Sequence, residues 1–281
     1  MLAAAEVNGL IYAIGGESNN SGGFDSLTVY DPVAGTWSTP TTTGSFTLRA
    51  GFAATTLNNL IYTFGGTVLS GYTNVVQVFN PATNTWTTPV TTGTFTSRWE
   101  MTSATTYGLI MVIGGEDATG ALITKLIVFN PQTNTWTTPV TTGNFTPRDA
   151  PRAETVNGLI YLFGGNNPNT NTYISTMDVY DDTTKTWTTI TPTGTFTPRK
   201  LLASAVVDNK IYAIGGVNAS GPSAAVEMFD PATNVWSTVT TTGTFTPRYG
   251  LAAAEYNNFI HVFGGYNTVY LNTNEALTYG P

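Results

Sequence analysis

A small set of charged and aromatic residues stands out in a sequence that is otherwise mostly neutral. The set is Trp99, Glu100, Asp149, Arg152, Glu154, Lys200 and Tyr249. Carboxylates and an arginine can hold a ligand by charge-assisted hydrogen bonds, and an aromatic ring can stack on a sugar or an apolar group. Each member lies shortly after a regularly recurring arginine. We therefore predict that these residues lie close together in the fold and form a ligand site. The alternative is that they differ between repeats only through ordinary loop variation.

The recurring arginines are themselves candidates for an anion site. They are Arg49, Arg98, Arg148, Arg199 and Arg248. Arranged around one opening, they could bind a carboxylate or a sulfate. The alternative is that each guanidinium bonds to neighbouring carbonyls or to an acid. Because the position is the same in every complete repeat, and a ligand site should break that symmetry, the structural role is favoured.

Several catalytic chemistries lack the residues they need. There is no cysteine and only one histidine, His261, so thiol catalysis and thiolate metal sites are excluded. His261 stands where four other repeats have tyrosine, which indicates a structural residue. The acidic pairs Glu116-Asp117 and Asp181-Asp182 are too short to argue a calcium site. We expect no metal, no cofactor and no catalytic residue.

Composition narrows the range of partners. The 281 residues are only 10% charged, 12% are aromatic, and the net charge is −7. An acidic chain with few Lys and Arg is a poor candidate for nucleic-acid binding or for anionic membranes. No apolar run is long enough to span a membrane, so we expect no membrane insertion. The low charge and the Thr- and Asn-rich surface favour an extracellular or cell-surface setting, with the cytoplasm as the alternative.

These residues belong to an internal repeat with four marks. The first mark is a glycine pair that follows a short apolar run. The pairs are Gly15-Gly16, Gly65-Gly66, Gly114-Gly115, Gly164-Gly165, Gly215-Gly216 and Gly264-Gly265. An aromatic residue follows, then a tryptophan at a constant spacing, and then the arginine, again at a constant spacing. The tryptophans are Trp37, Trp86, Trp136, Trp187 and Trp236.

The intervals between these marks separate packed segments from loops. The interval from each arginine to the next glycine pair is the same in every repeat, as from Arg49 to Gly65 and from Arg248 to Gly264, whereas the interval from the glycine pair to the aromatic varies. Fixed lengths indicate packed elements, and a varying length indicates an exposed loop. Asn-Gly or Asn-Asn pairs before the apolar runs predict hairpin turns. Each repeat is thus predicted to be four short antiparallel strands, here called a to d.

Six such sheets arranged in a circle bury the faces that one sheet alone would expose. The predicted repeats are residues 1–49, 50–98, 99–148, 149–199, 200–248 and 249–281, which form a single domain. In this arrangement the b–c loops and the d–a connections lie on one face. The b–c loops are residues 17–26, 67–74, 116–125, 166–176, 217–223 and 266–274. Their tyrosines Tyr72, Tyr173 and Tyr266 join the predicted ligand-binding residues.

The glycine pair, the aromatic and the tryptophan at these spacings resemble the kelch repeat. The resemblance covers essentially the whole chain and implies an all-β, six-bladed β-propeller of kelch type. It does not imply one function, because kelch propellers serve as protein-binding domains, as sugar-active enzymes and as parts of copper oxidases. The copper site of the oxidases needs two histidines and a cysteine, which this sequence lacks.

The sixth repeat departs from the pattern. After Tyr279 the sequence ends before the next tryptophan would occur, so we expect that either the chain is trimmed or the sixth blade lacks its outer strand. The resemblance implies that kelch rings are closed by strands from both termini in one blade. Without that device, the contact between blades six and one should be the weak point of the ring.

The function most consistent with these features is non-catalytic binding of a protein or a carbohydrate. The binding surface would be the b–c/d–a face around the channel mouth, where loop sequences vary. A sugar isomerase or mutarotase using carboxylates and an arginine at that mouth is the first alternative, and a self-assembling surface protein is the second. The oligomeric state stays open.

Overall fold

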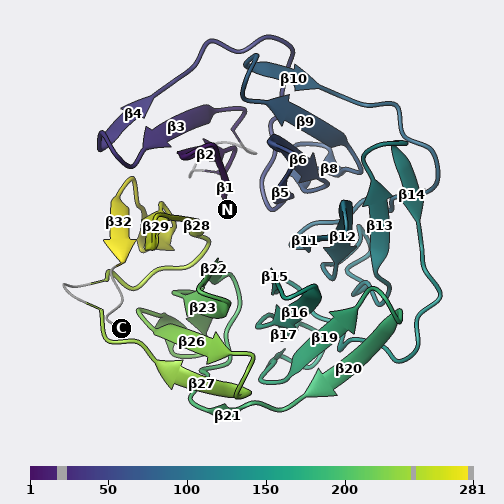
Figure 1. Ribbon diagram of the computed structural model, residues 1–281, viewed down its shortest axis with the longest axis vertical. Helices are drawn as coiled ribbons and strands as arrows, with labels where there is room; N and C mark the ends of the chain where they lie inside the picture. The colour runs from purple at the N-terminus through teal and green to yellow at the C-terminus, as the bar shows by residue number, and fades with distance from the viewer. Residues whose placement is uncertain (18–23, 242–244, 278–281) are drawn as a thin grey trace.

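A computed structural model of the chain, which describes residues 1–17, 24–241 and 245–277, is a ring of six antiparallel sheets around a central channel (Figure 1). The sequence prediction of a six-bladed propeller is confirmed. Part of the first b–c loop and Tyr279 lie outside the described residues. None of the described residues belongs to a helix that could serve as a membrane span.

The blades follow one another along the chain, with the first strand of each innermost. Blade 1 holds β1 (Ala3–Val7), β2 (Leu10–Ile14), β3 (Leu27–Asp31) and β4 (Thr36–Ser38). Blade 2 holds β5 (Ala53–Leu57), β6 (Leu60–Phe64), β9 (Val76–Asn80) and β10 (Thr85–Thr87). Blade 3 holds β11 (Thr102–Thr106), β12 (Leu109–Ile113), β13 (Ile127–Asn130) and β14 (Thr135–Thr137).

The second half of the ring repeats the arrangement up to its last blade. Blade 4 holds β15 (Arg152–Val156), β16 (Leu159–Phe163), β19 (Met177–Asp181) and β20 (Thr186–Ile190). Blade 5 holds β22 (Ala203–Val207), β23 (Lys210–Ile214), β26 (Val226–Asp230) and β27 (Val235–Thr238), with β21 (Thr193–Gly194) added in parallel. Blade 6 holds β28 (Ala252–Tyr256), β29 (Phe259–Phe263) and β32 (Asn274–Leu277), so among the described residues it has three strands where the others have four.

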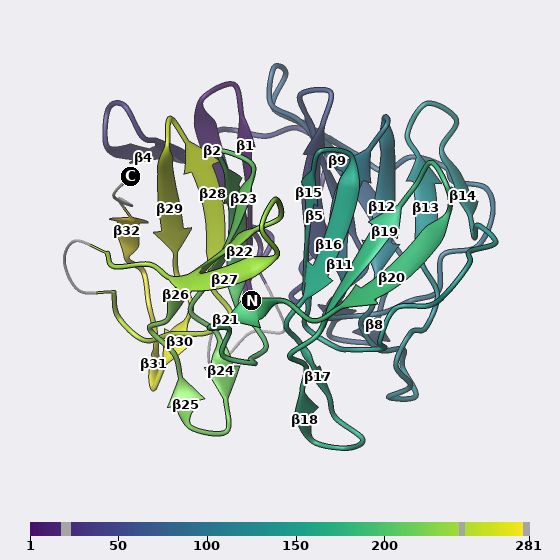
Figure 2. The same cartoon turned by 60° about the horizontal axis from the view of Figure 1, so that its bottom comes forward.

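Four of the variable loops contain short hairpins, which the sequence intervals did not predict. They are β7 (Thr67–Val68) with β8 (Gly71–Tyr72), β17 (Asn166–Asn167) with β18 (Thr172–Tyr173), β24 (Val217–Asn218) with β25 (Gly221–Pro222), and β30 (Tyr266–Asn267) with β31 (Val269–Tyr270). These hairpins project from one face of the ring (Figure 2). This face, which carries the b–c loops and the d–a connections, is called the hairpin face below.

The core lies between the blades rather than within one sheet. Trp136 is 4% exposed and packs on Phe64 of blade 2, on Phe129 of its own blade, and on Phe95 of the preceding d–a connection. Equivalent contacts surround Trp86 and Trp236, so each tryptophan joins two neighbouring blades. The innermost strands β1 and β28 also pack together, and this contact closes the ring.

The recurring arginines lie inside these interfaces. All five are at most 3% exposed. Arg148 donates to the carbonyls of Gly164 and Thr176 and pairs with the carboxylate of Asp178. Arg199 pairs in the same way with Glu227, and Arg248 with Glu275. Because all five guanidiniums are buried inside the interfaces, they are not exposed to an anion at the channel mouth.

Candidate functional site

The predicted ligand residues lie next to a series of backbone hydrogen bonds that runs around the channel. The second residue after each arginine has a positive φ, and in blades 3 to 6 it donates its N–H to the carbonyl of its counterpart in the preceding blade. The bonds run from Glu100 N to Gly51 O (2.9 Å), Ala150 N to Glu100 O (2.9 Å), Leu201 N to Ala150 O (3.4 Å) and Gly250 N to Leu201 O (2.8 Å). The ring sets the channel mouth and fixes the residues beside it.

A second regular feature joins each d–a connection to the start of the b–c loop in the same blade. The first residue after each arginine forms a β-bridge with the residue that follows the glycine pair. The bridges join Ala50 to Thr67, Trp99 to Glu116, Asp149 to Asn166, Lys200 to Val217 and Tyr249 to Tyr266. The sequence separation of the two partners is the same in all five bridges, so the constant interval from arginine to glycine could have predicted Glu116 and Asn166 as site residues.

Between blades 2 and 3, one carboxylate accepts hydrogen bonds from two aromatic side chains. Trp99 Nε1 donates to Glu116 Oε1 at 2.6 Å, and the hydroxyl of Tyr72 donates to the same oxygen at 3.1 Å. The two rings stack with centroids 5.6 Å apart. Burial, reinforced by the hydrogen bond to Glu116, raises the pKa of Tyr72 to about 12, so this hydroxyl remains a donor at neutral pH. The pair forms a rigid aromatic wall beside the mouth.

A second aromatic group lies on blade 6. The Tyr249 and Tyr266 rings have centroids 5.5 Å apart, and those of Tyr266 and Tyr270 are 5.1 Å apart, both in edge-on geometry. Trp99, Glu100 and the three tyrosines line one groove of about 650 Å³ at the hairpin face. Tyr270 was missed by sequence reasoning because the b–c loops do not share a sequence pattern that would single it out. Tyr173 of β18 does not line this groove.

Two buried acidic residues, Glu100 and Asp149, lie at the channel mouth. Glu100 is 7% exposed and Asp149 3% exposed, and Lys200 lies 3.4 Å from Asp149 Oδ2. Burial and the negative charge of Asp149 raise the pKa of Glu100 to about 8. Glu100 is therefore protonated near neutral pH and can donate a hydrogen bond.

Two buried polar groups lie side by side at this place, held by the β-bridge between Asp149 and Asn166. The protonated carboxyl of Glu100 hydrogen-bonds to Asp149, whereas Asn166 Oδ1 has no donor among the described residues. A buried acceptor without a donor costs free energy, so the mouth favours a ligand that supplies N–H or O–H groups.

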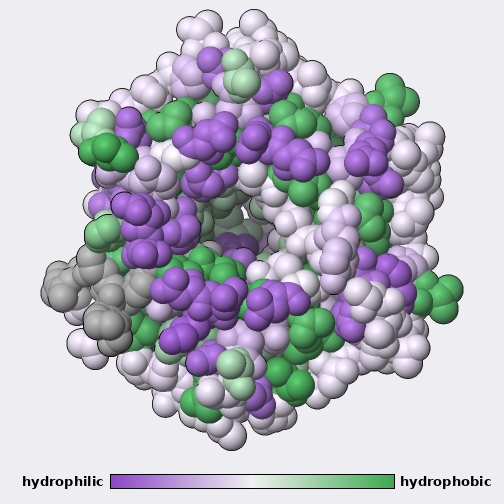
Figure 3. Space-filling view, viewed as in Figure 1, coloured by the Kyte–Doolittle hydropathy of each residue, from purple (hydrophilic) through white to green (hydrophobic). Residues whose placement is uncertain are grey.

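Arg152 and Glu154 lie deeper, in a part of the channel of about 210 Å³. Arg152 Nε donates to the carbonyl of Leu202 at 2.7 Å, and Ser204 donates to Glu154 at 2.6 Å. Burial lowers the pKa of Arg152 and raises that of Glu154. These two residues bond to channel walls, whereas Trp99, Glu100, Asp149 and Lys200 lie together at the mouth. The channel is the central hollow in Figure 3.

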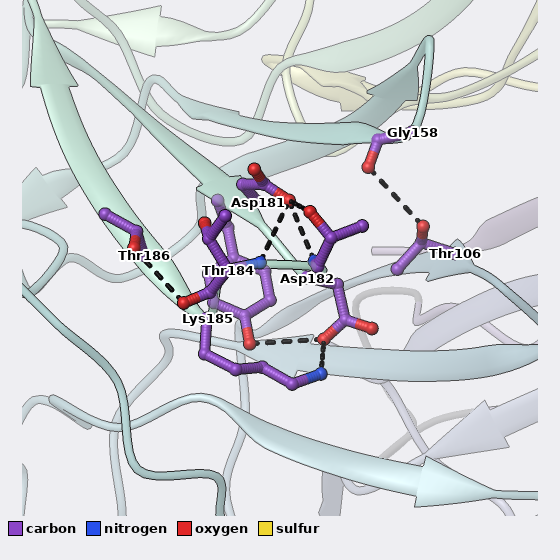
Figure 4. A network of polar contacts seen from close by, with 9 residues as sticks. Thr106, Gly158, Asp181, Asp182, Thr184, Lys185 and Thr186 are labelled. Atoms are coloured by element: carbon purple, nitrogen blue, oxygen red, sulfur yellow. Dashed lines mark hydrogen bonds and ion pairs between the residues drawn. The ribbon is translucent and has the colours of Figure 1, made fainter.

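The remaining polar candidates serve the fold. Asp181 accepts hydrogen bonds from the backbone N–H groups of Thr183 and Thr184, and Asp182 accepts from Tyr180 and Lys185 (Figure 4). This acidic pair fastens the c–d turn of blade 4.

His261 is 6% exposed and packs on Tyr30 across the interface between blades 6 and 1. In the part of the chain that the structure describes, no three His, Cys, Asp or Glu side chains gather as metal ligands.

Replacing Glu100 with glutamine should flatten the pH dependence of stability. In the unfolded chain the glutamate ionises near its ordinary pKa of 4.5, but in the fold it holds its proton up to about pH 8. Between these values the folded state binds more protons, so stability falls as pH rises. The contribution is fully present below pH 4.5 and lost by about pH 8. Glu100→Gln should therefore be more stable than the wild type at pH 8, by on the order of 4 kcal/mol.

Urea unfolding of both proteins at mildly acidic, neutral and mildly alkaline pH measures this difference. Burial lowers the pKa of His261, which acts in the opposite direction, but His261 is present in both proteins and cancels in the comparison. Parallel stability curves for the two proteins would show that Glu100 does not retain its proton.

Comparison with known families agrees with this geometry. The family model described as the KLHDC2/KLHL20/DRC7 Kelch-repeats domain matches residues 1–147 and 101–279. No curated protein matches the sequence.

Proposed function

Because the chain belongs to the KLHDC2/KLHL20/DRC7 Kelch-repeats domain family, whose propellers commonly act as protein-interaction scaffolds, we propose that it binds a protein partner at the channel mouth of the hairpin face. The partner segment would be basic, presenting lysine, arginine or an amino terminus. The observation that carries this proposal is the buried acceptor Asn166 Oδ1, which has no donor among the described residues and lies beside the buried carboxylate of Asp149. A cationic donor offers them charge-assisted hydrogen bonds.

The surroundings of the mouth support the same partner chemistry. Glu116 and Asp117 follow the glycine pair of blade 3, and Lys200 is the one lysine beside Asp149 among the described residues. The net charge of −7 attracts basic segments at long range, and this attraction weakens as salt is added. The stacked rings of Tyr72 and Trp99 offer an aromatic surface on which an arginine can stack.

Titration calorimetry with short peptides tests this proposal. A lysine- and arginine-rich peptide should bind, an acidic peptide of the same length should not, and affinity should fall as salt rises. Asp149→Asn should weaken binding about tenfold, which corresponds to about 1.4 kcal/mol. Asp181→Asn is the matched control, because Asp181 lies on an exposed c–d turn. Equal binding of basic and acidic peptides would contradict the proposal.

One observation favours a second candidate, a sugar-active enzyme. A protonated Glu100 beside a carboxylate is an arrangement suited to general acid catalysis, and the aromatic walls could stack on a sugar. Incubation with a panel of free sugars, followed by NMR of the interconversion between their α and β anomers, tests this possibility. Turnover that is lost in Glu100→Gln while binding persists would favour the enzyme over the pure scaffold.

A further inference from the structure

The carboxyl groups of Glu100 and Asp149 meet across two neighbouring blades. Each residue lies in a d–a connection, and the hydrogen bond from Ala150 N to Glu100 O, 2.9 Å long, holds these two connections together. Both side chains are buried, and the Glu100 carboxyl hydrogen-bonds to Asp149. Two ionised carboxylates have only acceptors, so a hydrogen bond between them needs a proton on one of the two. The pair therefore consists of an acid and a carboxylate that share one proton.

Charged and titratable groups from several elements surround Glu100. They are Asp149 and Lys200 of the next two d–a connections, Glu116 of the blade 3 b–c loop, Arg152 of β15 and Tyr72 of β8. Asp149 and Glu116 oppose the ionisation of Glu100, whereas Lys200 favours it. Lys200 Nζ lies 3.4 Å from Asp149 Oδ2 and so compensates the negative charge that the pair already carries. Among the described residues no cation forms an ion pair with Glu100 itself.

A buried acceptor beside the pair indicates where a ligand's N–H group would lie. Asn166 is 4% exposed, its Oδ1 has no donor among the described residues, and the β-bridge places it next to Asp149. A lysine or arginine side chain at this place can donate to Asn166 Oδ1 and to the Asp149 carboxylate together. Its positive charge, within about 4–6 Å of the pair, also favours the ionised form of Glu100. The proton and the ligand's cation thus compete for the same two carboxyl groups.

We propose that the channel mouth exchanges one proton for the cationic group of its partner, and that Glu100 is the residue that releases the proton. This inference rests on the proposed function, because it concerns how the same mouth accepts a basic segment. In the free protein the proton lies between Glu100 and Asp149. In the complex both carboxylates face the ligand's cation, and the proton passes to the solvent. The net charge of the pair and its occupant is the same in both states, because a proton and a lysine or arginine side chain are all monovalent cations.

The exchange makes affinity depend on pH. Burial and the charge of Asp149 raise the pKa of Glu100 in the free protein to about 8, whereas lysine and arginine stay charged throughout the neutral range. Release of one proton per bound ligand makes Kd fall about tenfold for each pH unit below that value. Above it the affinity becomes independent of pH. By reciprocity, each bound proton weakens ligand binding by the factor by which the ligand weakens proton binding.

Titration calorimetry in two buffers of different ionisation enthalpy, phosphate and Tris, counts the protons released at neutral pH. The ligand is a lysine- and arginine-rich peptide with acetylated and amidated ends, so none of its groups titrates in this range. The difference in measured enthalpy should correspond to about one proton released per bound peptide. In the infrared difference spectrum of bound minus free protein, the band of a protonated carboxyl should be lost.

Two variants assign the proton to its residue. Glu100→Gln has no proton to release, so its Kd should change little with pH and its infrared spectrum should show no loss of a carboxyl band. Asp181→Asn, on an exposed c–d turn, should release as many protons as the wild type. The buffer comparison and the infrared measurement also apply to the wild type alone, so the test does not depend on the folding of either variant.

The possible outcomes separate this inference from the proposed function. Binding without proton release, or with equal release from wild type and Glu100→Gln, would overturn the exchange and leave the proposed function standing. Absence of peptide binding from mildly acidic to mildly alkaline pH would overturn both. Proton release by the wild type that is lost in Glu100→Gln alone is the expected result.

Discussion

Replacing Trp136 with alanine should lower the free energy of unfolding by about 3–5 kcal/mol, whereas Trp37→Ala should cost about 1 kcal/mol. Trp136 is 4% exposed and contacts Phe64 and Phe129 of two neighbouring blades. It also contacts Phe95 of the d–a connection between these blades, which is called the linker below. Its removal leaves a cavity that the surrounding strands cannot fill. Trp37 occupies the same repeat position but is 48% exposed, so much of its surface already contacts water.

Urea denaturation followed by circular dichroism measures both variants. The pair is a strict comparison because residue type, strand position and repeat context are shared, and only the covering linker differs. Trp37 still packs on Tyr30 and Phe263, with centroids 5.1 and 5.4 Å away, so a small loss is expected rather than none. Equal losses at the two positions would show that the linker does not contribute to the burial energy.

Gly93→Ala should destabilise the protein by about 3 kcal/mol, and Gly120→Ala by about 1 kcal/mol. Both glycines have a positive φ, 81° and 80°, so alanine is strained at either position. They differ in their surroundings. A Cβ on Gly93 would lie 2.3 Å from the carbonyl oxygen of Trp136, whereas a Cβ on Gly120 would meet nothing within 4 Å.

Both variants lose stability through backbone strain, but only Gly93→Ala also places a Cβ against the neighbouring blade. The difference between their unfolding free energies therefore measures the cost of that close contact alone. A displaced linker would also weaken the hydrogen bond from Trp136 N to Thr92 O. Thermal unfolding of both variants gives the comparison. If the two losses were the same, strain alone would explain why glycine occupies the linker position.

The blade count and the shortened sixth blade could be predicted because they depend on intervals. Packed strands keep a fixed length, so the equal intervals from Arg49 to Gly65 and from Arg248 to Gly264 identify the same element in every repeat. The positions of Trp99, Glu100, Asp149 and Lys200 at one mouth follow from the same rule, since each lies directly after an arginine or one position further on.

The partners of those residues could not be predicted with the same ease. The repeat fixes the backbone bridge between Trp99 and Glu116, but the hydrogen bond between their side chains depends on which residues occupy those two positions, and these differ in every blade. The proton on Glu100 depends on burial next to Asp149, which comes from the neighbouring blade. Such properties arise from contacts between repeats, and a repeat pattern describes each unit separately.

The packing of β1 on β28 has a consequence for the entropy of the chain. Neighbouring innermost strands are close in sequence, since β1 begins at Ala3 and β5 at Ala53, but β28 begins only at Ala252. Loop-closure entropy grows only with the logarithm of length, so a loop roughly five times longer makes the closing contact cost about 1.4 kcal/mol more than any other blade contact. That penalty is small compared with the burial energy of one tryptophan. The contact between β1 and β28 is therefore affordable in entropy, and new chain ends placed in any d–a connection would face nearly the same closure cost.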